Sequence, residues 1–252
     1  MGKISIISLI YQSTAYAQSV YENVMRHTPE IAAGEAEFFF VANDATDEVL
    51  NFLEDKDYPH YMNNNPHYTD AEKFAMGYAY PEYAGRVYMG YNFGIRAASN
   101  PIIMWINSDN RFSPNWLSNL KRRLTPFLIV SPRIIQPDTT FPNPINHTTC
   151  EVMNFGKGVN SFKEEAFLAK VKQISRDDVS VGNAFFPAMV YKKNIEAIGY
   201  FKEGNLHAGH YMNILETGDT HFYNQLAEMG IKHITVNDSI VYHFNQGEKF
   251  LK

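Results

Sequence analysis

An acidic residue follows an unbroken apolar segment near the middle of the chain. The segment covers residues 102–106, and Asn107, Ser108, Asp109 and Asn110 come directly after it. Such a run predicts a strand covered on both faces, as in parallel α/β sheets, where ligands bind at the carboxyl ends of the strands. At that position the Asp109 carboxylate can hold a divalent cation together with phosphate oxygens. The alternative interpretation is an ordinary turn formed by the same residues.

Polar side chains follow other predicted strands in a similar way. Asn43 and Asp44 come after a phenylalanine-rich segment, and His243 comes after the last apolar strand segment. Ordinary turn formation for Asn43 and Asp44, and a packed strand-end position for His243, are the alternatives. Asp219 lies in the first turn of a predicted helix, where an acidic side chain commonly stabilises the helix N-terminus.

Two further features can suggest reactive or metal-binding chemistry. His207 and His210 have the spacing of a zinc-binding pair, but no third or fourth ligand is apparent nearby, so we interpret them as loop residues. Cys150 is the only cysteine, which excludes an intramolecular disulfide and fits a reducing compartment.

The elements that position these residues alternate between strands and helices up to about residue 132. The predicted strands cover residues 4–10, 38–41, 102–106 and 128–131, and the predicted helices cover 15–27, 46–53, 85–99 and a segment N-capped by Ser113. This order predicts a doubly wound parallel sheet. Gly90 and Gly94 lie inside the third helix, which indicates close approach of a neighbour or ligand.

The second half of the chain is less regular. Residues 132–178 are rich in Pro, Asn and Thr, and we interpret them as an excursion over the site that can act as a lid. Beyond them we expect a strand over 181–191, a helix over 193–198, a helix opening at 217–219, and two strands at 231–236 and 239–242. No internal repeat or linker is present, so residues 1–252 are expected to form one domain.

Composition limits the classes of partner. The chain has 252 residues, 45% of them hydrophobic and 19% charged, with a net charge of -5. This balance gives no whole-chain reason to expect nucleic-acid or anionic-membrane binding. The apolar run beginning at Ile4 is too short for a signal peptide, and no segment approaches the roughly 20 apolar residues of a membrane span. We therefore expect a cytoplasmic protein without a transmembrane segment.

Taken in order, the segments resemble a nucleotide-sugar-dependent glycosyltransferase of the GT-A fold, close to the inverting family 2 type. The resemblance is carried by ISIISLIY, FFFVANDATDE, GYNFGIRAASNPIIMWINSDNRFSPNWLSNL, AMVYKKNIEAIGYF, ETGDTHFYNQLAEMG and VYHF. It implies a Rossmann-like three-layer α/β/α sandwich with a mostly parallel central sheet. Residues 1–132 would form the nucleotide-binding half, and residues 133–252 the acceptor-binding and catalytic half.

The resemblance also implies roles for individual residues. The nucleotide would be bound by Ile10, Tyr11, Gln12, Asn43, Asp44, Asn107 and Ser108. Asp109 and His243 would hold Mn²⁺ or Mg²⁺, and Asp219 would be the general base. Two positions depart from the family pattern, because Asn107 replaces the first acid of the metal motif and Gly218 replaces the glutamate that precedes the base.

Three functions are considered for this sequence. The first is inverting transfer of a sugar from a UDP- or GDP-linked donor to the hydroxyl of a glycan or other acceptor. The second is a sugar-phosphate nucleotidyltransferase, which needs a glycine-rich, basic segment after the first strand, where LIYQSTAYAQS supplies neither. The third is a non-catalytic nucleotide- or carbohydrate-binding module, which the departures at Asn107 and Gly218 motivate.

Overall fold

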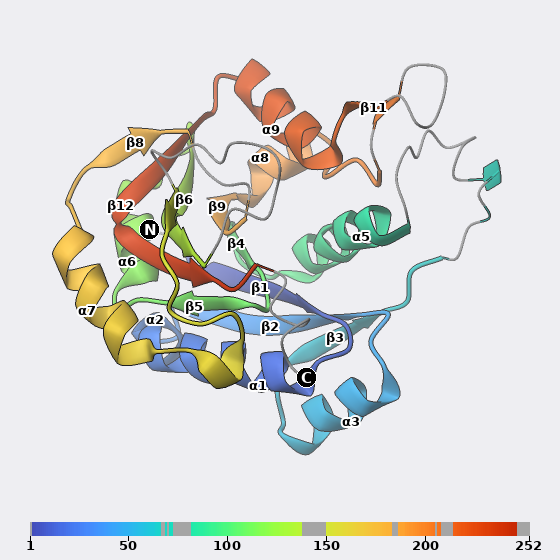
Figure 1. The fold of residues 1–252 in the computed structure, drawn as a ribbon. Coiled ribbons are helices and arrows are strands. Elements are labelled where there is room, and N and C mark those ends of the chain that lie inside the picture. The colour runs from blue at the N-terminus through green and yellow to red at the C-terminus, as the bar shows by residue number, and fades with distance from the viewer. Residues whose placement is uncertain are drawn as a thin grey trace.

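The computed structural model describes residues 2–66, 69, 71–72, 82–137, 150–182, 186–204, 206–207 and 214–245. In this part of the chain a ten-stranded sheet forms the centre of the molecule, and helices lie on both of its faces (Figure 1). The strands of this sheet are β1 (Ile4–Ile10), β2 (Ala36–Asn43), β3 (His60–Asn63), β4 (Ile102–Ile106), β5 (Asn110–Phe112), β6 (Leu128–Gln136), β7 (Cys150–Val152), β8 (Val179–Val181), β9 (Ala188–Tyr191) and β12 (Lys232–His243). The helices are α1 (Thr14–His27), α2 (Pro29–Ala32), α3 (Asp47–Asp55), α5 (Glu82–Ala97), α6 (Trp116–Arg123), α7 (Glu164–Ile174), α8 (Lys192–Ala197) and α9 (Gly218–Glu228). Two short strands, β10 (Leu206–His207) and β11 (Ile214–Glu216), form a separate antiparallel pair.

The central sheet is mostly parallel. Its strand order is β3-β2-β1-β4-β9-β6-β12-β5, with β7 beside β6 and β8 beside β12. Strands β1, β2, β3 and β4 pair in parallel, and so do β6, β7 and β12. Strand β9 lies antiparallel between these two groups, and β5 and β8 pair antiparallel with β12. The expected α/β class with a mostly parallel sheet is therefore confirmed.

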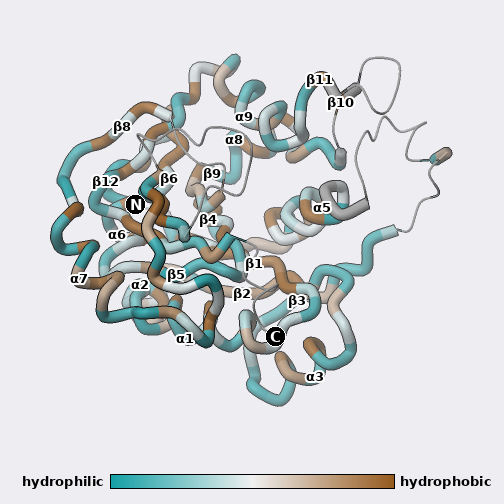
Figure 2. The backbone as a smooth tube through the Cα atoms, in the orientation of Figure 1, coloured by the Kyte–Doolittle hydropathy of each residue, from teal (hydrophilic) through white to brown (hydrophobic). Residues whose placement is uncertain are grey.

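Each face of the sheet packs on its own hydrophobic core. Ile4 and Ile6 of β1 belong to a core that includes buried residues of α1, α3, α6 and α7. Ile7, which points to the opposite face, belongs to a core that includes α5, α8 and α9. Figure 2 shows hydrophobic residues along the central strands and mixed character along the surrounding helices. The result is the predicted three-layer α/β/α sandwich.

Several helix ends follow from local sequence signals. The Thr46 hydroxyl caps α3 by accepting a hydrogen bond from the N–H of Val49 (3.4 Å). Gly199 and Gly230 follow α8 and α9 with φ angles of 79° and 78°, a backbone conformation that glycine adopts without steric strain. The predicted ends of these helices are therefore confirmed.

Three predictions about helices and strands are wrong in detail. Residues 181–191 do not form one strand, because β8 pairs with β12 whereas β9 pairs with β4 and β6. Ser113 is not a helix cap, since α6 begins at Trp116 and the Ser113 side chain instead accepts from the N–H of Ile240 (3.4 Å). The two strands expected near the chain end form the single strand β12, which has a register shift between Val236 and Ile240.

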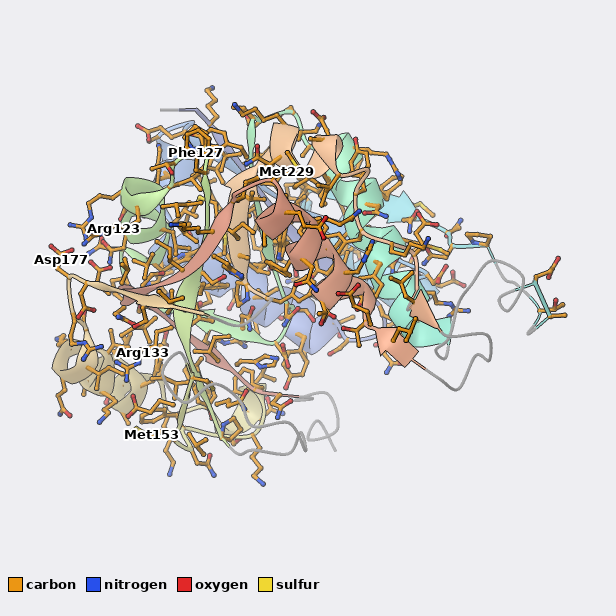
Figure 3. The ribbon with its side chains drawn as sticks, turned by 90° about the horizontal axis from the view of Figure 1, so that it is seen from above. Arg123, Phe127, Arg133, Met153, Asp177 and Met229 are labelled. Atoms are coloured by element: carbon orange, nitrogen blue, oxygen red, sulfur yellow. The ribbon has the colours of Figure 1, made fainter. Side chains whose placement is uncertain are left out.

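The described part of the 132–178 segment packs against the sheet. The Tyr242 hydroxyl donates to the carbonyl of Gly156 (2.6 Å) and accepts from the N–H of Phe155 (3.1 Å). Asp177, which follows α7, forms ion pairs with Arg122 and Arg123 of α6. Arg123 and Asp177 lie at the periphery of the molecule (Figure 3). Residues 138–149 of the expected lid lie outside the described part of the chain.

No helix within the described ranges is both long enough and apolar enough to cross a membrane.

Candidate active site

Strands β5 and β12 bring Asp109 and His243 together. Asn110, the first residue of β5, pairs with His243, the last residue of β12, and the N–H of Phe244 donates to the carbonyl of Asp109 (3.1 Å). His243 Nε2 lies 3.3 Å from Asp109 Oδ1, and 22% of the His243 side chain and 14% of the Asp109 side chain remain exposed. The two proposed metal ligands are thus neighbours, while metal binding itself stays a prediction.

The charge of Asp109 controls the ionisation of its partner. Burial lowers the pKa of His243, but the negative charge of Asp109 and the hydrogen bond to it raise the pKa by more. The pKa of the imidazole therefore lies above its usual value. Because a metal ligand must be deprotonated at its coordinating nitrogen, the raised pKa makes cation binding by His243 compete with protons to a higher pH.

The chemistry of this donor set fits a hard divalent cation that arrives with phosphate. Among the described residues, no group of three or more His, Cys, Asp or Glu side chains could hold a metal ion. Mg²⁺ commonly uses one or two carboxylates together with water and substrate phosphates, so two protein ligands suffice for it. A structural zinc site needs about four protein ligands and does not match.

Asn107 is held by the helix α5. The Tyr91 hydroxyl donates to the carbonyl of Ile106 (3.1 Å) and lies 3.3 Å from Asn107 Oδ1. The N–H of Asn107 also donates to Asn110 Oδ1 (2.9 Å), and the N–H of Asn110 donates back to the Asn107 carbonyl (3.2 Å). This closed turn contains Ser108 and Asp109, so it fixes the backbone from which the Asp109 carboxylate projects.

Asn43 and Asp44 lie in a network of amide side chains at the ends of β2 and β3. Asn43 Oδ1 accepts from the side chains of Asn63 and Asn65 (2.8 Å each), and Asn43 Nδ2 donates to the carbonyl of Arg86 (3.1 Å). The Asp44 carboxylate accepts from the backbone and side chain of Asn65 (2.8 and 2.9 Å) and lies 3.4 Å from Arg86 Nε. Asn43 thus joins neighbouring elements, and Asp44 is the more exposed residue of the predicted nucleotide-binding pair.

The first loop lies beside this network. The carbonyl of Tyr11 accepts from the N–H of Thr46 (3.0 Å), which joins the loop after β1 to the loop after β2. The Tyr11 side chain is 46% exposed, whereas Ile10 is only 2% exposed and lies in the core. Gln12 is also exposed. Of these predicted nucleotide-binding residues, Tyr11 and Gln12 present side chains at the surface.

Asp219 occupies the first turn of α9. Its Oδ1 accepts hydrogen bonds from the N–H of Thr220 (2.8 Å) and from the hydroxyl of the N-cap residue Thr217. The N–H of Asp219 donates to the Tyr88 hydroxyl (3.2 Å). Burial raises the pKa of Tyr88, and the nearby Asp219 charge raises it further, so the hydroxyl keeps its proton. The structure places Asp219 in the geometry of a first-turn acid, and its role as general base stays a prediction.

Helix α5 contacts each of the three parts of the candidate site. Arg86 approaches Asp44, Tyr88 bonds to Asp219, and Tyr91 lies beside Asn107. These three side chains come from less than two turns of one helix. Helix α5 therefore contacts a predicted nucleotide-binding residue, the predicted base and the turn that contains Asp109, and it lies against the sheet (Figure 1).

Four further residues at this site were not predicted from the sequence, namely Asn63, Asn65, Arg86 and Arg111. The first two belong to an asparagine-rich segment without periodicity, and the closely spaced amides were the only available signal. Arg111 immediately follows the acidic turn but is only 4% exposed, and a buried arginine has no distinctive sequence pattern.

The remaining sequence candidates contribute little to this site. His207 was expected to be a loop residue, but it lies in β10, which pairs with β11. His210 lies outside the described residues. Cys150 is 5% exposed, and burial raises the pKa of its thiol to about 11. A thiol that remains protonated is a poor nucleophile.

Comparison with known proteins identifies the fold. No protein-family model matches the sequence, and no curated protein matches it in sequence. The structure is similar to that of GalNAc-T7 with UDP, GalNAc and Mn²⁺, with 11% identity and a TM-score of 0.61 over 96% of this chain and 44% of that one. The chain has the fold of the GT-A glycosyltransferases.

Two further solved structures share this fold. The mannosyltransferase PcManGT from Pyrobaculum calidifontis, in complex with GDP-Man and Mn²⁺, matches with 14% identity and a TM-score of 0.56 over 96% of this chain and 56% of that one. Residues 1–349 of S. aureus TarS match with 12% identity and a TM-score of 0.55 over 96% of this chain and 60% of that one. The chain thus spans 44% to 60% of the length of the three chains that it matches.

Proposed function

We propose that this chain is a glycosyltransferase that moves a sugar from a UDP- or GDP-linked donor to an acceptor hydroxyl with inversion. The main observation in support of the proposal is the contact between Asp109 and His243 at the carboxyl ends of the strands of a GT-A sheet. Helix α5 contacts the turn that contains Asp109, and it also contacts Asp44 and Asp219. Two structural neighbours contain a nucleotide or nucleotide sugar together with Mn²⁺, which supports the same ligand class here.

The carboxylate of Asp109 and the imidazole of His243 are the groups that would hold Mn²⁺ or Mg²⁺. When bound, the ion would stabilise negative charge on the departing nucleotide diphosphate. Asp44 and Tyr11 would contact the base and ribose, in keeping with the exposed Tyr11 side chain and the partly exposed Asp44 carboxylate at the ends of β1 and β2. Tyr91 and Asn110 would keep the turn that contains Asp109 in place.

Asp219 would act on the acceptor. Its carboxylate would take the proton from the acceptor hydroxyl while that oxygen bonds to the anomeric carbon of the sugar and the bond to the diphosphate oxygen breaks. The hydrogen bonds from Thr220 and Thr217 fix one carboxylate oxygen of Asp219 at the start of α9. In this arrangement residues 1–132 serve mainly the nucleotide, and residues 133–252 serve mainly the acceptor and the base.

A thermal-shift experiment tests the nucleotide and metal sites together. UDP, GDP, CMP and dTDP would each be added with and without Mn²⁺ to the wild type and to Asp109→Ala. A ligand at 100 times its Kd stabilises the folded state by about 2.7 kcal/mol, so a bound nucleotide gives a clear shift. We expect one nucleotide to raise the Tm only with Mn²⁺, and Asp109→Ala to abolish that rise. Asp177→Ala, which removes a peripheral carboxylate, is the control and should respond like the wild type.

The alternative function is a non-catalytic nucleotide- or carbohydrate-binding module. It is favoured by Asn107 and Gly218, which occupy two positions where the resemblance implies acids. A module would bind nucleotide but cleave no donor with water or any acceptor. Absence of any nucleotide-dependent shift would contradict the proposed transferase function.

A further inference from the structure

Arg111 is a buried cation beside the Asp109–His243 pair. It is only 4% exposed, and no Asp or Glu of the described residues lies within ion-pair distance of its guanidinium. Its Nη1 atom donates to the carbonyl of Asn110 (2.6 Å), and its Nη2 atom donates to the Ser19 hydroxyl on α1. The guanidinium carbon lies 5.0 Å from the centroid of the Phe244 ring.

These contacts reach both sides of the candidate metal site. Asn110 directly follows Asp109, and Phe244 directly follows His243. The N–H of Phe244 donates to the Asp109 carbonyl, so the two segments are also joined through their backbones (3.1 Å). Arg111 therefore contacts the carbonyl of Asn110 next to Asp109, the ring of Phe244 next to His243, and helix α1.

Burial of the Arg111 guanidinium is unfavourable in free energy. Removing the charge from water carries a large penalty, and an apolar side chain of similar volume is often neutral or stabilising in such positions. A side chain that served packing alone would not need to be an arginine. The planar fork, however, can donate in two directions while its face lies on an aromatic ring, which neither lysine nor methionine can do.

We propose that Arg111 is a positioning residue that holds Asp109 and His243 in the arrangement required for a divalent cation. This inference rests on the proposed function, because it assigns Arg111 to the metal site of that function. Residues that orient metal ligands commonly change metal affinity by about 10- to 100-fold when they are replaced. Arg111 would act in this way through the backbone at Asn110 and the ring of Phe244.

The test measures Mn²⁺ affinity and stability in the same variants. Free Mn²⁺ would be followed by electron paramagnetic resonance during titration, with and without UDP or GDP, for the wild type, Arg111→Met and Arg111→Lys. We expect Arg111→Met to keep or raise the Tm and to weaken Mn²⁺ binding by about 10- to 100-fold. Arg111→Lys keeps the charge but not the fork, so it should also bind Mn²⁺ more weakly. Arg133→Met, which removes an arginine paired with Glu151, is the control and should bind Mn²⁺ like the wild type.

The possible outcomes separate the inference from the proposed function. Wild-type affinity in Arg111→Met, or tighter binding, overturns the role of Arg111 while leaving the metal site intact. A lower Tm with unchanged affinity would show a structural role only. Failure of the wild type to bind Mn²⁺ under any condition would overturn the proposed function, and the role of Arg111 with it.

A second pair of variants covers the case in which Arg111→Met does not fold. Ser19→Ala removes the partner of Nη2, and Phe244→Leu removes the ring beneath the guanidinium, while Arg111 remains in both. Each should weaken Mn²⁺ binding without loss of the folded state. Wild-type affinity in both variants would overturn the inference.

Discussion

Position 218 has no room for a side chain. A Cβ atom there would lie 2.5 Å from the carbonyl oxygen of Gly204, 2.6 Å from the Tyr88 ring and 3.0 Å from the Lys202 carbonyl oxygen. The glutamate that the resemblance implies at this position is therefore excluded by packing, since backbone atoms surround the site. Glycine stands at position 218 because the start of α9 packs closely on the backbone of residues 202–204 and on Tyr88. Asp219 is then the acidic residue of the first turn of α9.

Asp219→Asn separates the base from the helix-capping role at this residue. The amide oxygen of asparagine can still accept from Thr220 and Thr217, so we expect α9 to remain folded. The asparagine side chain cannot take a proton from an acceptor hydroxyl. We therefore expect kcat to fall by about 10²- to 10⁴-fold while the affinity for the donor is retained. Steady-state kinetics and nucleotide titration measure the two quantities.

Glu228→Gln is the matched control for this substitution, because it makes the same charge change on an exposed residue at the other end of α9. It should leave kcat and donor affinity unchanged. Full activity in Asp219→Asn would mean that another group accepts the proton and that Asp219 only stabilises the helix.

Some residues of the site could be found from the sequence and others could not. Asp109 and His243 each lie at the end of an apolar segment, and the carboxyl ends of parallel strands collect at one edge of a sheet, so their place at the same edge could be predicted. Their direct contact depends on the antiparallel pairing of β5 with β12, which the sequence did not indicate. Asn63 is the last residue of β3, and Asn65 follows this strand of only four residues, none of which is buried. Because that strand lies at the sheet edge, it lacks the hydrophobic pattern that would have placed the amides.

At the scale of elements, α5 fits closely against the sheet because it has glycine at two contact positions. A Cβ on Gly94 would lie 2.7 Å from a side-chain carbon of Ile7 and 2.9 Å from one of Val41. A Cβ on Gly90 would lie 2.7 Å from Asn43 Oδ1. The expectation of close approach at both glycines is confirmed. This spacing lets Arg86, Tyr88 and Tyr91 reach the site from one helix.

Gly94→Ala tests this packing against helix propensity. Alanine favours a helix over glycine by up to about 1 kcal/mol, but overpacking a core costs about 1–3 kcal/mol. Since both neighbours of the new methyl group are buried core side chains, we expect Gly94→Ala to lower the free energy of unfolding. Urea denaturation measures the change.

Gly85→Ala provides the comparison on the same helix. A Cβ at Gly85 would meet only the Glu203 carbonyl oxygen, at 3.6 Å, which is an ordinary contact distance. Here the helix propensity should dominate, and we expect the free energy of unfolding to rise by up to about 1 kcal/mol. Equal effects at the two positions would contradict the close packing of α5 on β1 and β2.

The order of the elements was more predictable than their pairing. The segment over residues 181–191 is mostly apolar but is interrupted by Gly182, Asn183 and Pro187. These residues signal a break in a strand, but they do not show that β8 and β9 pair with different strands. The three-residue strand β5 follows a turn and precedes Ser113, whose polar pattern resembles a helix start. Such features depend on contacts between distant segments and carry no local signal.

For the molecule as a whole, His233 makes stability depend on pH. Burial lowers the pKa of His233 to about 3, and its ring lies parallel to the Tyr223 ring at a centroid distance of 4.6 Å. A free histidine has a pKa of about 6.5, so between these values the unfolded chain binds more protons than the folded one. The contribution of His233 to stability is therefore present above about pH 6.5 and is lost as the pH falls through this window.

We expect the urea midpoint of the wild type to fall more between pH 7 and pH 5 than that of His233→Gln. Because His233 is only partly buried, the loss of stability at low pH should be smaller than for a fully buried histidine. His60→Gln, the same substitution on the edge strand β3, should keep the pH dependence of the wild type. Parallel curves for all three proteins would show that His233 does not control this dependence.

The pairing of β5 with β12 also bears on how the chain reaches its folded state. More than half of the sequence separates Asn110 from His243, and contacts across such distances form slowly because a long loop must close first. Interactions that are absent from the folding transition state affect unfolding rates far more than folding rates. An ion shared by Asp109 and His243 would therefore prolong the lifetime of the native protein while leaving its rate of formation almost unchanged.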